Sequence, residues 1–164
     1  MTQMDKQILG VTAEFAVAAE LGRRNIYAQL TLGNQKRVDL LLFGNNNRKL
    51  LKVEVKGKNS RSWANLKGLF DDTTLFVFVD YFNKKEDEPP DFYIVSKGDW
   101  KKLIEDLYGE GIKKGFIKLD EDGTPTWPAQ KTKSGKPYSG AEFTIKDLAN
   151  HKNKWEKIIN RLSE

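Results

Sequence analysis

Residues 37–58 constrain the fold of this chain more than any other segment, because they predict a β-hairpin with one apolar and one charged face. Two runs, RVDLLLF and LLKVEVK, flank a Gly44-Asn45-Asn46-Asn47 turn signal. If residues 44–49 form the loop, Leu42 faces Leu51, Leu40 faces Val53 and Val38 faces Val55. Alternation along the strands then places all six aliphatic side chains on one face, where the first helix can cover them.

The other face of this hairpin carries charge. Asp39 lies beside Glu54 there, and Cβ atoms in such cross-strand pairs are about 4.5–5.5 Å apart. Facing carboxylates destabilise a sheet unless positive charge bridges them. A divalent cation bridges them better than the neighbouring basic side chains, because Mg²⁺ prefers carboxylate oxygens, water and phosphates. These basic neighbours are Arg37, Lys52 and Lys56.

Two further groups fit a metal site on this face. The Val55 carbonyl is a candidate third protein ligand. Lys56 shares the face with Glu54 and is placed to position or help deprotonate an attacking water. The hypothesis is therefore a metal-assisted hydrolysis, and the alternative is a solvated charged surface.

The pattern Asp39…Glu54-Val55-Lys56, preceded by Gly10-x-x-x-Glu14 on a predicted helix, resembles the PD-(D/E)XK phosphodiesterase superfamily. The resemblance is closest to the Holliday-junction-resolvase-like branch and covers residues 8–58 best. It implies a restriction-endonuclease-like fold, Mg²⁺ (or Mn²⁺ as a substitute) on Asp39 and Glu54, and Lys56 assisting the nucleophilic water. It also implies that Glu14 contacts the metal directly or through water. Val38 precedes Asp39 where the motif has proline.

Hydrophobic periodicity predicts a mixed α/β sheet flanked by helices, in the order α-β-β-β-α-β-β-α with a C-terminal helix. We expect one domain over 1–164, with a core at about 5–108 and a loop-rich extension at 109–164. Ser96 is the expected cap of the helix at about 98–108. The other expected elements are a helix at 5–24, strands at 26–32, 37–43, 50–56, 75–81 and 92–95, a short helix or loop at 58–67, mostly loop at 109–142 with a short strand at 116–119, and a helix at 152–162.

Charge favours a nucleic-acid partner. The chain has 28 Lys and Arg against 23 Asp and Glu, and residues 48–67 hold seven basic residues with Glu54 as their one acid. Residues 129–140 have three lysines and no acid, which suits either an arm on a substrate backbone or a solvated loop. Trp63 suits base stacking or core packing. The predicted nucleic-acid contacts are Arg37, Lys52, Lys58, Arg61, Trp63 and Lys67.

Composition excludes several other classes of protein. With no cysteine, disulfides and cysteine-ligated metals are excluded. His151 is the only histidine, which excludes His-rich metal sites and leaves it as a general base or a structural residue. No apolar stretch approaches a membrane span, and the N-terminus lacks the pattern of a secretory signal, so we expect a cytoplasmic protein.

The leading prediction is a Mg²⁺-dependent endonuclease acting on DNA, with RNA left open. The first alternative is a non-catalytic nucleic-acid-binding or accessory protein on the same fold. The second is a protein-interaction domain. A stripe of apolar residues on the last helix would dock on the core or on a second copy in a homodimer: Trp155, Ile158, Ile159 and Leu162.

Overall fold

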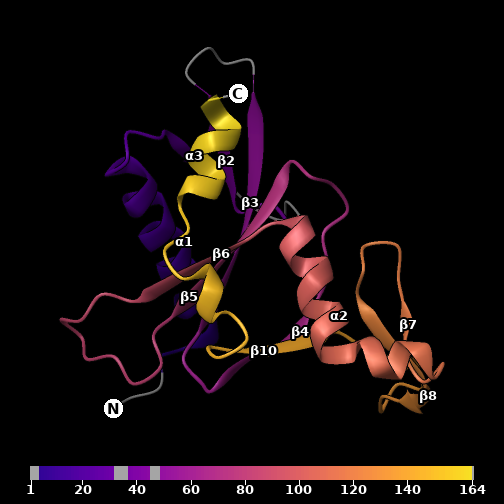
Figure 1. The fold of residues 1–164 in the computed structure, drawn as a ribbon. Helices are drawn as coiled ribbons and strands as arrows, with labels where there is room; N and C mark the ends of the chain where they lie inside the picture. Colours follow the sequence, from indigo (N-terminus) through magenta and orange to yellow (C-terminus); the bar gives the residue numbers. More distant parts are fainter. Residues whose placement is uncertain (1–3, 32–36, 45–48, 164) are drawn as a thin grey trace.

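The computed structural model describes residues 4–31, 37–44 and 49–163 and is a mixed α/β fold built on a five-stranded sheet (Figure 1). The strand order is β1-β2-β3-β5-β6. Strand β2 is antiparallel to β1 and β3, β3 is parallel to β5, and β6 is antiparallel to β5. The strands are β1 (Ala28–Leu30), β2 (Leu40–Phe43), β3 (Leu50–Lys58), β5 (Thr74–Asp80) and β6 (Asp91–Val95).

The β2–β3 hairpin has the predicted register. Leu40 is the partner of Val53 and Leu42 of Leu51, and all four are buried in one apolar cluster. The prediction for Val38 is wrong: it does not join that cluster and instead lines a hollow beside Glu54. The reason is that β2 begins only at Leu40, after a bend, so strict alternation does not extend back to residue 38.

Two cores lie on opposite faces of the sheet. Helices α1 (Lys6–Gly22) and α3 (Glu156–Ser163) share the core on the aliphatic face, to which Val17 and Ile158 contribute fully buried side chains. The second core is aromatic and contains Phe76, Phe78 and Trp100. It is covered by α2 (Lys97–Lys113) and by a two-stranded sheet of β4 (Ser62–Leu66) and β10 (Ala141–Thr144). Residues 141–158 therefore contribute buried side chains to both cores.

Local capping explains where the longer helices begin. The carboxylate of Asp5 accepts a hydrogen bond from the backbone N–H of Gln7 (2.8 Å) at the start of α1. Ser96 caps α2 as predicted, in a capping box with Asp99. Helix α2 continues five residues past its predicted end, to Lys113. A Cβ atom at Gly111 would lie 2.6 Å from Ile117 Cδ1, so the glycine allows the chain to return closely against the helix.

The predicted helix or loop at 58–67 is instead a strand. Strand β4 pairs with β10, and Trp63 and Leu66 are buried in the aromatic core. Its partner strand lies about eighty residues away in the sequence, so local propensity did not reveal the pairing. The connection between the parallel strands β3 and β5 thus contains a strand where a helix was expected.

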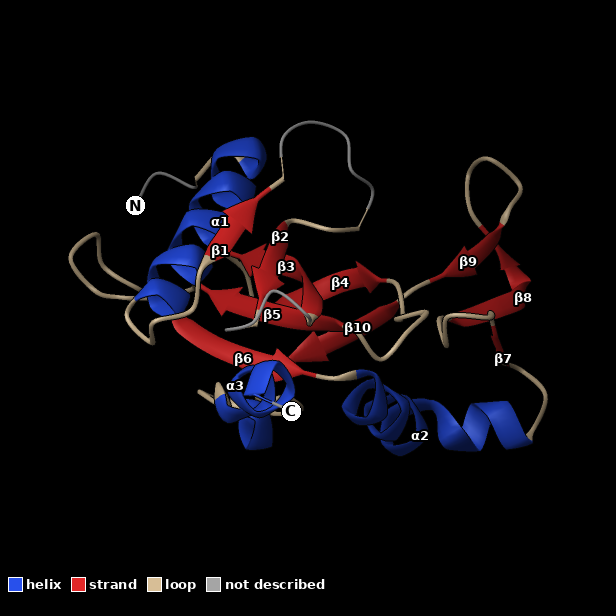
Figure 2. Ribbon diagram, turned by 90° about the horizontal axis from the view of Figure 1, so that it is seen from above, coloured by secondary structure: helices blue, strands red, loops and turns tan. Residues whose placement is uncertain are grey.

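The predicted loop at 109–142 is also wrong in large part. Strands β7 (Lys118–Leu119), β8 (Pro125–Lys131) and β9 (Pro137–Ser139) form a separate three-stranded sheet, far from α1 (Figure 2). Trp127 lies opposite Tyr138, and Gly135 adopts a positive φ of 79° in the β8–β9 turn. The last helix begins at Glu156, later than predicted, because Lys152 forms a β-bridge with Tyr93 and Asn153 adopts a positive φ of 54°.

Within the described ranges, no helix is long and apolar enough to cross a membrane. Three sequence-based predictions fall outside the described residues: the Gly33-Asn34 turn signal that separates the strands predicted at 26–32 and 37–43, the Asn45–Asn47 part of the hairpin loop, and the contribution of Arg48 to the basic segment.

Candidate active site

Four residues singled out from the sequence form one chain of electrostatic contacts. Glu14 projects from α1, Asp39 lies in the bend before β2, and Glu54 and Lys56 come from β3. Asp39 is close enough to Glu14 to raise its pKa, and Lys56 interacts with both Asp39 and Glu54. The structure therefore brings together the helix acid, the hairpin acids and the lysine.

Asp39 is fixed at the point where β2 leaves the ladder. Its backbone N–H donates to the Val53 carbonyl (2.8 Å), and its Oδ2 accepts from the Val55 N–H (2.6 Å). The carboxylate thus takes the place of a backbone acceptor at the end of the strand. Asp39 Oδ2 is therefore held by the backbone of Val55, the residue between Glu54 and Lys56.

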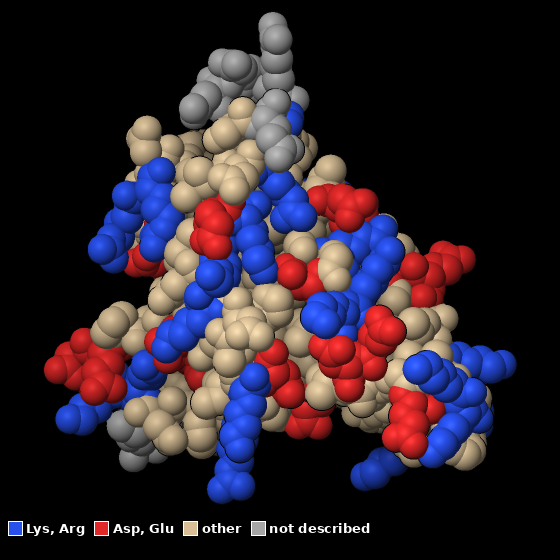
Figure 3. All heavy atoms as spheres, in the orientation of Figure 1, with Lys and Arg blue, Asp and Glu red and all other residues tan. Residues whose placement is uncertain are grey.

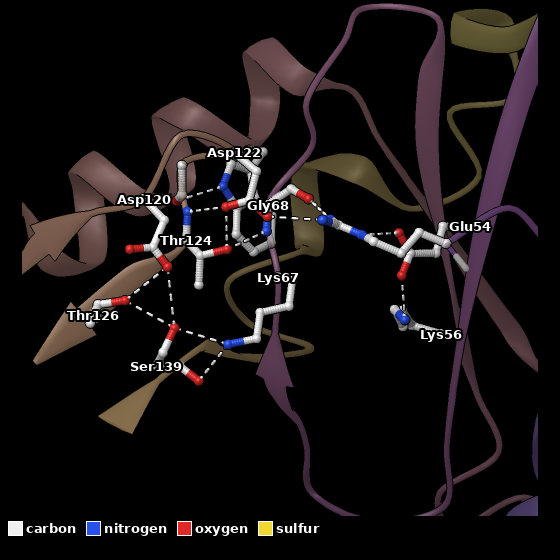
Figure 4. A network of polar contacts seen from close by, with 12 residues as sticks. Glu54, Lys56, Lys67, Gly68, Asp120, Asp122, Thr124, Thr126 and Ser139 are labelled. Carbon is white, nitrogen blue, oxygen red and sulfur yellow. Dashed lines mark hydrogen bonds and ion pairs between the residues drawn. The ribbon is translucent and has the colours of Figure 1, made fainter. Parts of the chain in front are cut away.

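Glu54 is a buried carboxylate with two basic neighbours. Its side chain is 5% exposed, with Oε1 lying 2.6 Å from Lys56 Nζ and Oε2 lying 3.5 Å from Arg37 Nε (Figure 4). Oε2 is buried, yet no group among the described residues donates a hydrogen bond to it. Because an unsatisfied buried polar oxygen costs about 1–3 kcal/mol, this atom is a strong candidate for an additional ligand.

The electrostatics favour added positive charge at this point. Burial raises the pKa of Glu14, and the neighbouring Asp39 carboxylate raises it further. Burial also raises the pKa of Asp39, although the Val55 N–H and Lys56 act in the opposite direction. Both carboxylates are therefore less acidic than in water, and a cation between them would favour their ionised forms.

A hollow of about 220 Å³ opens beside Glu54. Its walls include Arg37 and Lys52 together with Phe70, whose side chain is 60% exposed. Arg37 lies over the Phe70 ring, with its guanidinium carbon 5.1 Å from the ring centroid. The remaining lining residues are Val38, Leu69, Asp71 and Thr74. Cationic and aromatic groups thus surround a space that the buried carboxylate also reaches.

Arg37 connects Glu54 to the C-terminal half of the chain. Its Nη1 lies 2.9 Å from Asp122 Oδ2, and its Nη2 donates to the Gly68 carbonyl (Figure 4). Its backbone has a φ of 68°, an uncommon conformation for a residue other than glycine. Asp122 and Gly68 were not predicted as site residues, because nothing local in the sequence links them to residue 37.

The structure does not support a phosphate-contacting role for Lys58 or a base-stacking role for Trp63. The Lys58 side chain is 3% exposed and its Nζ lies 2.5 Å from Asp80 Oδ1. Trp63 is buried in the aromatic core, and its indole N–H donates to the Lys56 carbonyl (2.7 Å). Both residues are therefore structural.

The other predicted nucleic-acid contacts are at the surface, but most have partners in the chain. Lys52 Nζ lies 2.7 Å from Asp71 Oδ2. The amine of Lys67 donates to the carbonyl and the hydroxyl of Ser139, each at 2.9 Å. Arg61 is exposed. Lys52 and Lys58 are thus paired with acids, Lys67 is held by neutral groups, and Arg61 is exposed.

His151 lies outside the candidate site. Its Nδ1 is 2.9 Å from Lys157 Nζ, and Lys157 also contacts Asp99 (2.7 Å) and the Ile94 carbonyl. Burial and the nearby Lys157 lower the pKa of His151. This arrangement links α3 to α2 and β6, so the histidine has a structural role.

Among the residues that the structure describes, no three acidic or histidine side chains converge as a ready metal cage. Comparisons with known proteins add no assignment: no family model matches the chain, and searches of curated proteins and of solved structures found no match.

Proposed function

We propose that this chain is a Mg²⁺-dependent nuclease that hydrolyses phosphodiester bonds of DNA on a restriction-endonuclease-like fold. The observation that carries the proposal is the series of pairwise contacts from Glu14 to Asp39, from Asp39 to Lys56 and from Lys56 to Glu54, with one buried oxygen of Glu54 left without a hydrogen-bond donor among the described residues. A structural charged surface would satisfy that oxygen internally. A hydrolytic site would leave it for a ligand.

The donor set suits a hard cation of this type. Mg²⁺ is usually held by one or two carboxylates, with water and substrate phosphate completing its coordination. Asp39 and Glu54 would hold it, with the Val55 carbonyl and Glu14 as additional oxygen ligands. Bound Mg²⁺ would supply a water of lowered pKa and would neutralise charge on the phosphate oxygens.

The protein groups around these ligands have separate roles. The Lys56 amine, which lies 2.6 Å from Glu54 Oε1, would orient the attacking water or neutralise charge that develops on the phosphate. Arg37 would hold Glu54 in place from the other side through its Nε. Phosphodiester cleavage here would therefore depend mostly on positioning and electrostatics.

A second candidate is a nucleic-acid-binding protein without hydrolysis. One observation favours it: Lys56 and Arg37 already flank both oxygens of Glu54, so the carboxylate has protein cations on either side. In that case the hollow beside Glu54 would contact phosphate or a base without a metal. The two candidates differ in their need for a divalent ion.

The deciding experiment is Mg²⁺ and Mn²⁺ titration by calorimetry, with cleavage assays on plasmid and branched DNA. Asp39→Asn and Glu54→Gln retain side-chain volume, and Glu86→Gln in the exposed acidic loop removes the same charge elsewhere. We expect metal binding and cleavage in the wild type and in Glu86→Gln, and loss of both in the two site variants. DNA binding with neither metal binding nor cleavage would favour the second candidate. No metal binding, no cleavage and no DNA binding in the folded wild type would reject both.

A further inference from the structure

The lysines of the β8–β9 hairpin differ from the basic residues around the candidate site. Arg37, Lys52 and Lys56 each have an acidic partner. In contrast, three hairpin lysines are exposed and form no side-chain ion pair or hydrogen bond anywhere in the described part of the chain. They are Lys131, Lys133 and Lys136.

This hairpin is also free of negative charge. No acidic residue occurs from 123 to 141, so the lysines meet no neutralising neighbour along their own strands. Over the face that Figure 3 shows, by contrast, acidic and basic side chains lie next to one another. The hairpin is therefore a local concentration of unpaired positive charge.

The hairpin is well braced despite its exposure. Thr132 and Lys136 close the turn, with the Thr132 N–H donating to the Lys136 carbonyl (2.8 Å). Trp127 lies between two tyrosines, with ring centroids 5.6 Å from Tyr108 on α2 and 5.4 Å from Tyr138 on β9. The lysines thus project from an ordered two-stranded arm, which lowers the entropy lost when they bind a ligand.

Several contacts fix the base of this arm to the candidate site. Lys67 at the end of β4 donates to Ser139, and the Gly68 N–H donates to Thr124 Oγ1 (2.8 Å). Arg37 holds Asp122 in the same turn while it also contacts Glu54 (Figure 4). The arm and the buried carboxylate therefore belong to one connected network.

We propose that the β8–β9 hairpin is a clamp for the phosphate backbone of nucleic acid, held at a set position beside the Glu54 site. This inference rests on the proposed function and names the surface that holds its substrate. Phosphate contacts by unpaired lysines release condensed counterions, whereas paired lysines would first have to leave their carboxylates. This inference places the main electrostatic contact with nucleic acid in the C-terminal half of the chain, where the sequence had predicted it at residues 48–67.

The test compares two triple variants of the full chain that remove the same charge. Lys131, Lys133 and Lys136 are changed to alanine in the first, and Lys85, Lys101 and Lys102, which are also exposed, in the second. Binding to a fluorescent DNA duplex is measured by anisotropy in EDTA, over roughly 50–200 mM salt. We expect the slope of log K against log salt to become shallower by about 2.7 in the hairpin variant, at about 0.9 per lost phosphate contact, with much less change in the control.

Three results would overturn the proposal. Equal slopes in the two variants would mean that net charge alone matters. If the hairpin variant binds DNA like the wild type, the hairpin is not a clamp. The nuclease proposal would then still be decided by the metal-binding and cleavage assays. Binding of the wild type to vesicles containing phosphatidylserine, with none to DNA or RNA, would reject a nucleic-acid partner altogether. Circular dichroism of both variants confirms that the comparison is between folded proteins.

Discussion

Replacing Lys58 by methionine should strongly destabilise this protein. Lys58 and Asp80 are partners in the parallel β3–β5 register, and their side chains are 3% and 7% exposed. The lysine amine also donates to the Ser60 carbonyl (3.0 Å) and lies 4.5 Å from the centroid of the Trp63 ring. Methionine has a similar length but supplies neither charge nor a donor.

The magnitude follows from the charge that would remain. Without Lys58, the buried Asp80 carboxylate keeps only the Phe82 N–H (2.8 Å) as a donor among the residues that the structure describes. Breaking a buried ion pair by removing one partner costs about 3–5 kcal/mol, mainly because the other charge is left uncompensated. The Lys58–Trp63 cation–π contact adds about 0.5–2 kcal/mol to this interaction. The expected decrease in the free energy of unfolding is a large part of the 5–15 kcal/mol that typically stabilises a domain.

Urea denaturation followed by circular dichroism measures this loss. With a slope of about 2 kcal/mol per M for a small protein, the midpoint should fall by roughly 2 M. The double variant Lys58→Met, Asp80→Asn removes both charges and should be more stable than Lys58→Met alone. A midpoint shift below about 0.5 M for Lys58→Met would refute the reasoning, because it would show that Asp80 gains little from the pair.

Three further substitutions test other parts of the structure. Gly68→Ala would place a Cβ atom 1.9 Å from the Asp122 carbonyl oxygen, so we expect a loss of about 1–3 kcal/mol in urea denaturation. In contrast, Gly109→Ala in α2 would place a Cβ atom at an ordinary contact distance of 3.6 Å from Glu105 Cγ and should gain about 0.5–1 kcal/mol, and equal effects would contradict the predicted clash. His151→Gln should reduce the loss of thermal stability on acidification. Because burial lowers the pKa of His151 below 6.5, the unfolded chain takes up its proton first, and folding is weakened as the pH falls through that value. Parallel profiles of melting temperature against pH in the two proteins would contradict this role.

The candidate site was predictable where it depends on short-range order. Alternation across the β2–β3 hairpin placed Glu54 and Lys56 on the charged face, opposite the aliphatic cluster. Asp39 was expected as a cross-strand partner of Glu54 but lies in a bend before β2, where it accepts from the Val55 N–H, and Glu14 was expected from the family resemblance. The network that surrounds Glu54 was not predictable, because Arg37 reaches it together with Asp122, which lies 85 residues further along the chain.

The sequence alone determined the register of the hairpin, the division of its two faces and the capping of α2 by Ser96. These features depend on residues a few positions apart, where alternation, turn residues and local hydrogen bonds act directly. Only the tertiary structure decided which charges are available for a partner. Lys58 and the hairpin lysine Lys133 are the same residue type in basic segments, but one is buried against Asp80 and the other is exposed and unpaired within the described chain. That difference arises because burial and ion pairing depend on elements distant in sequence, which pack together only in the folded chain.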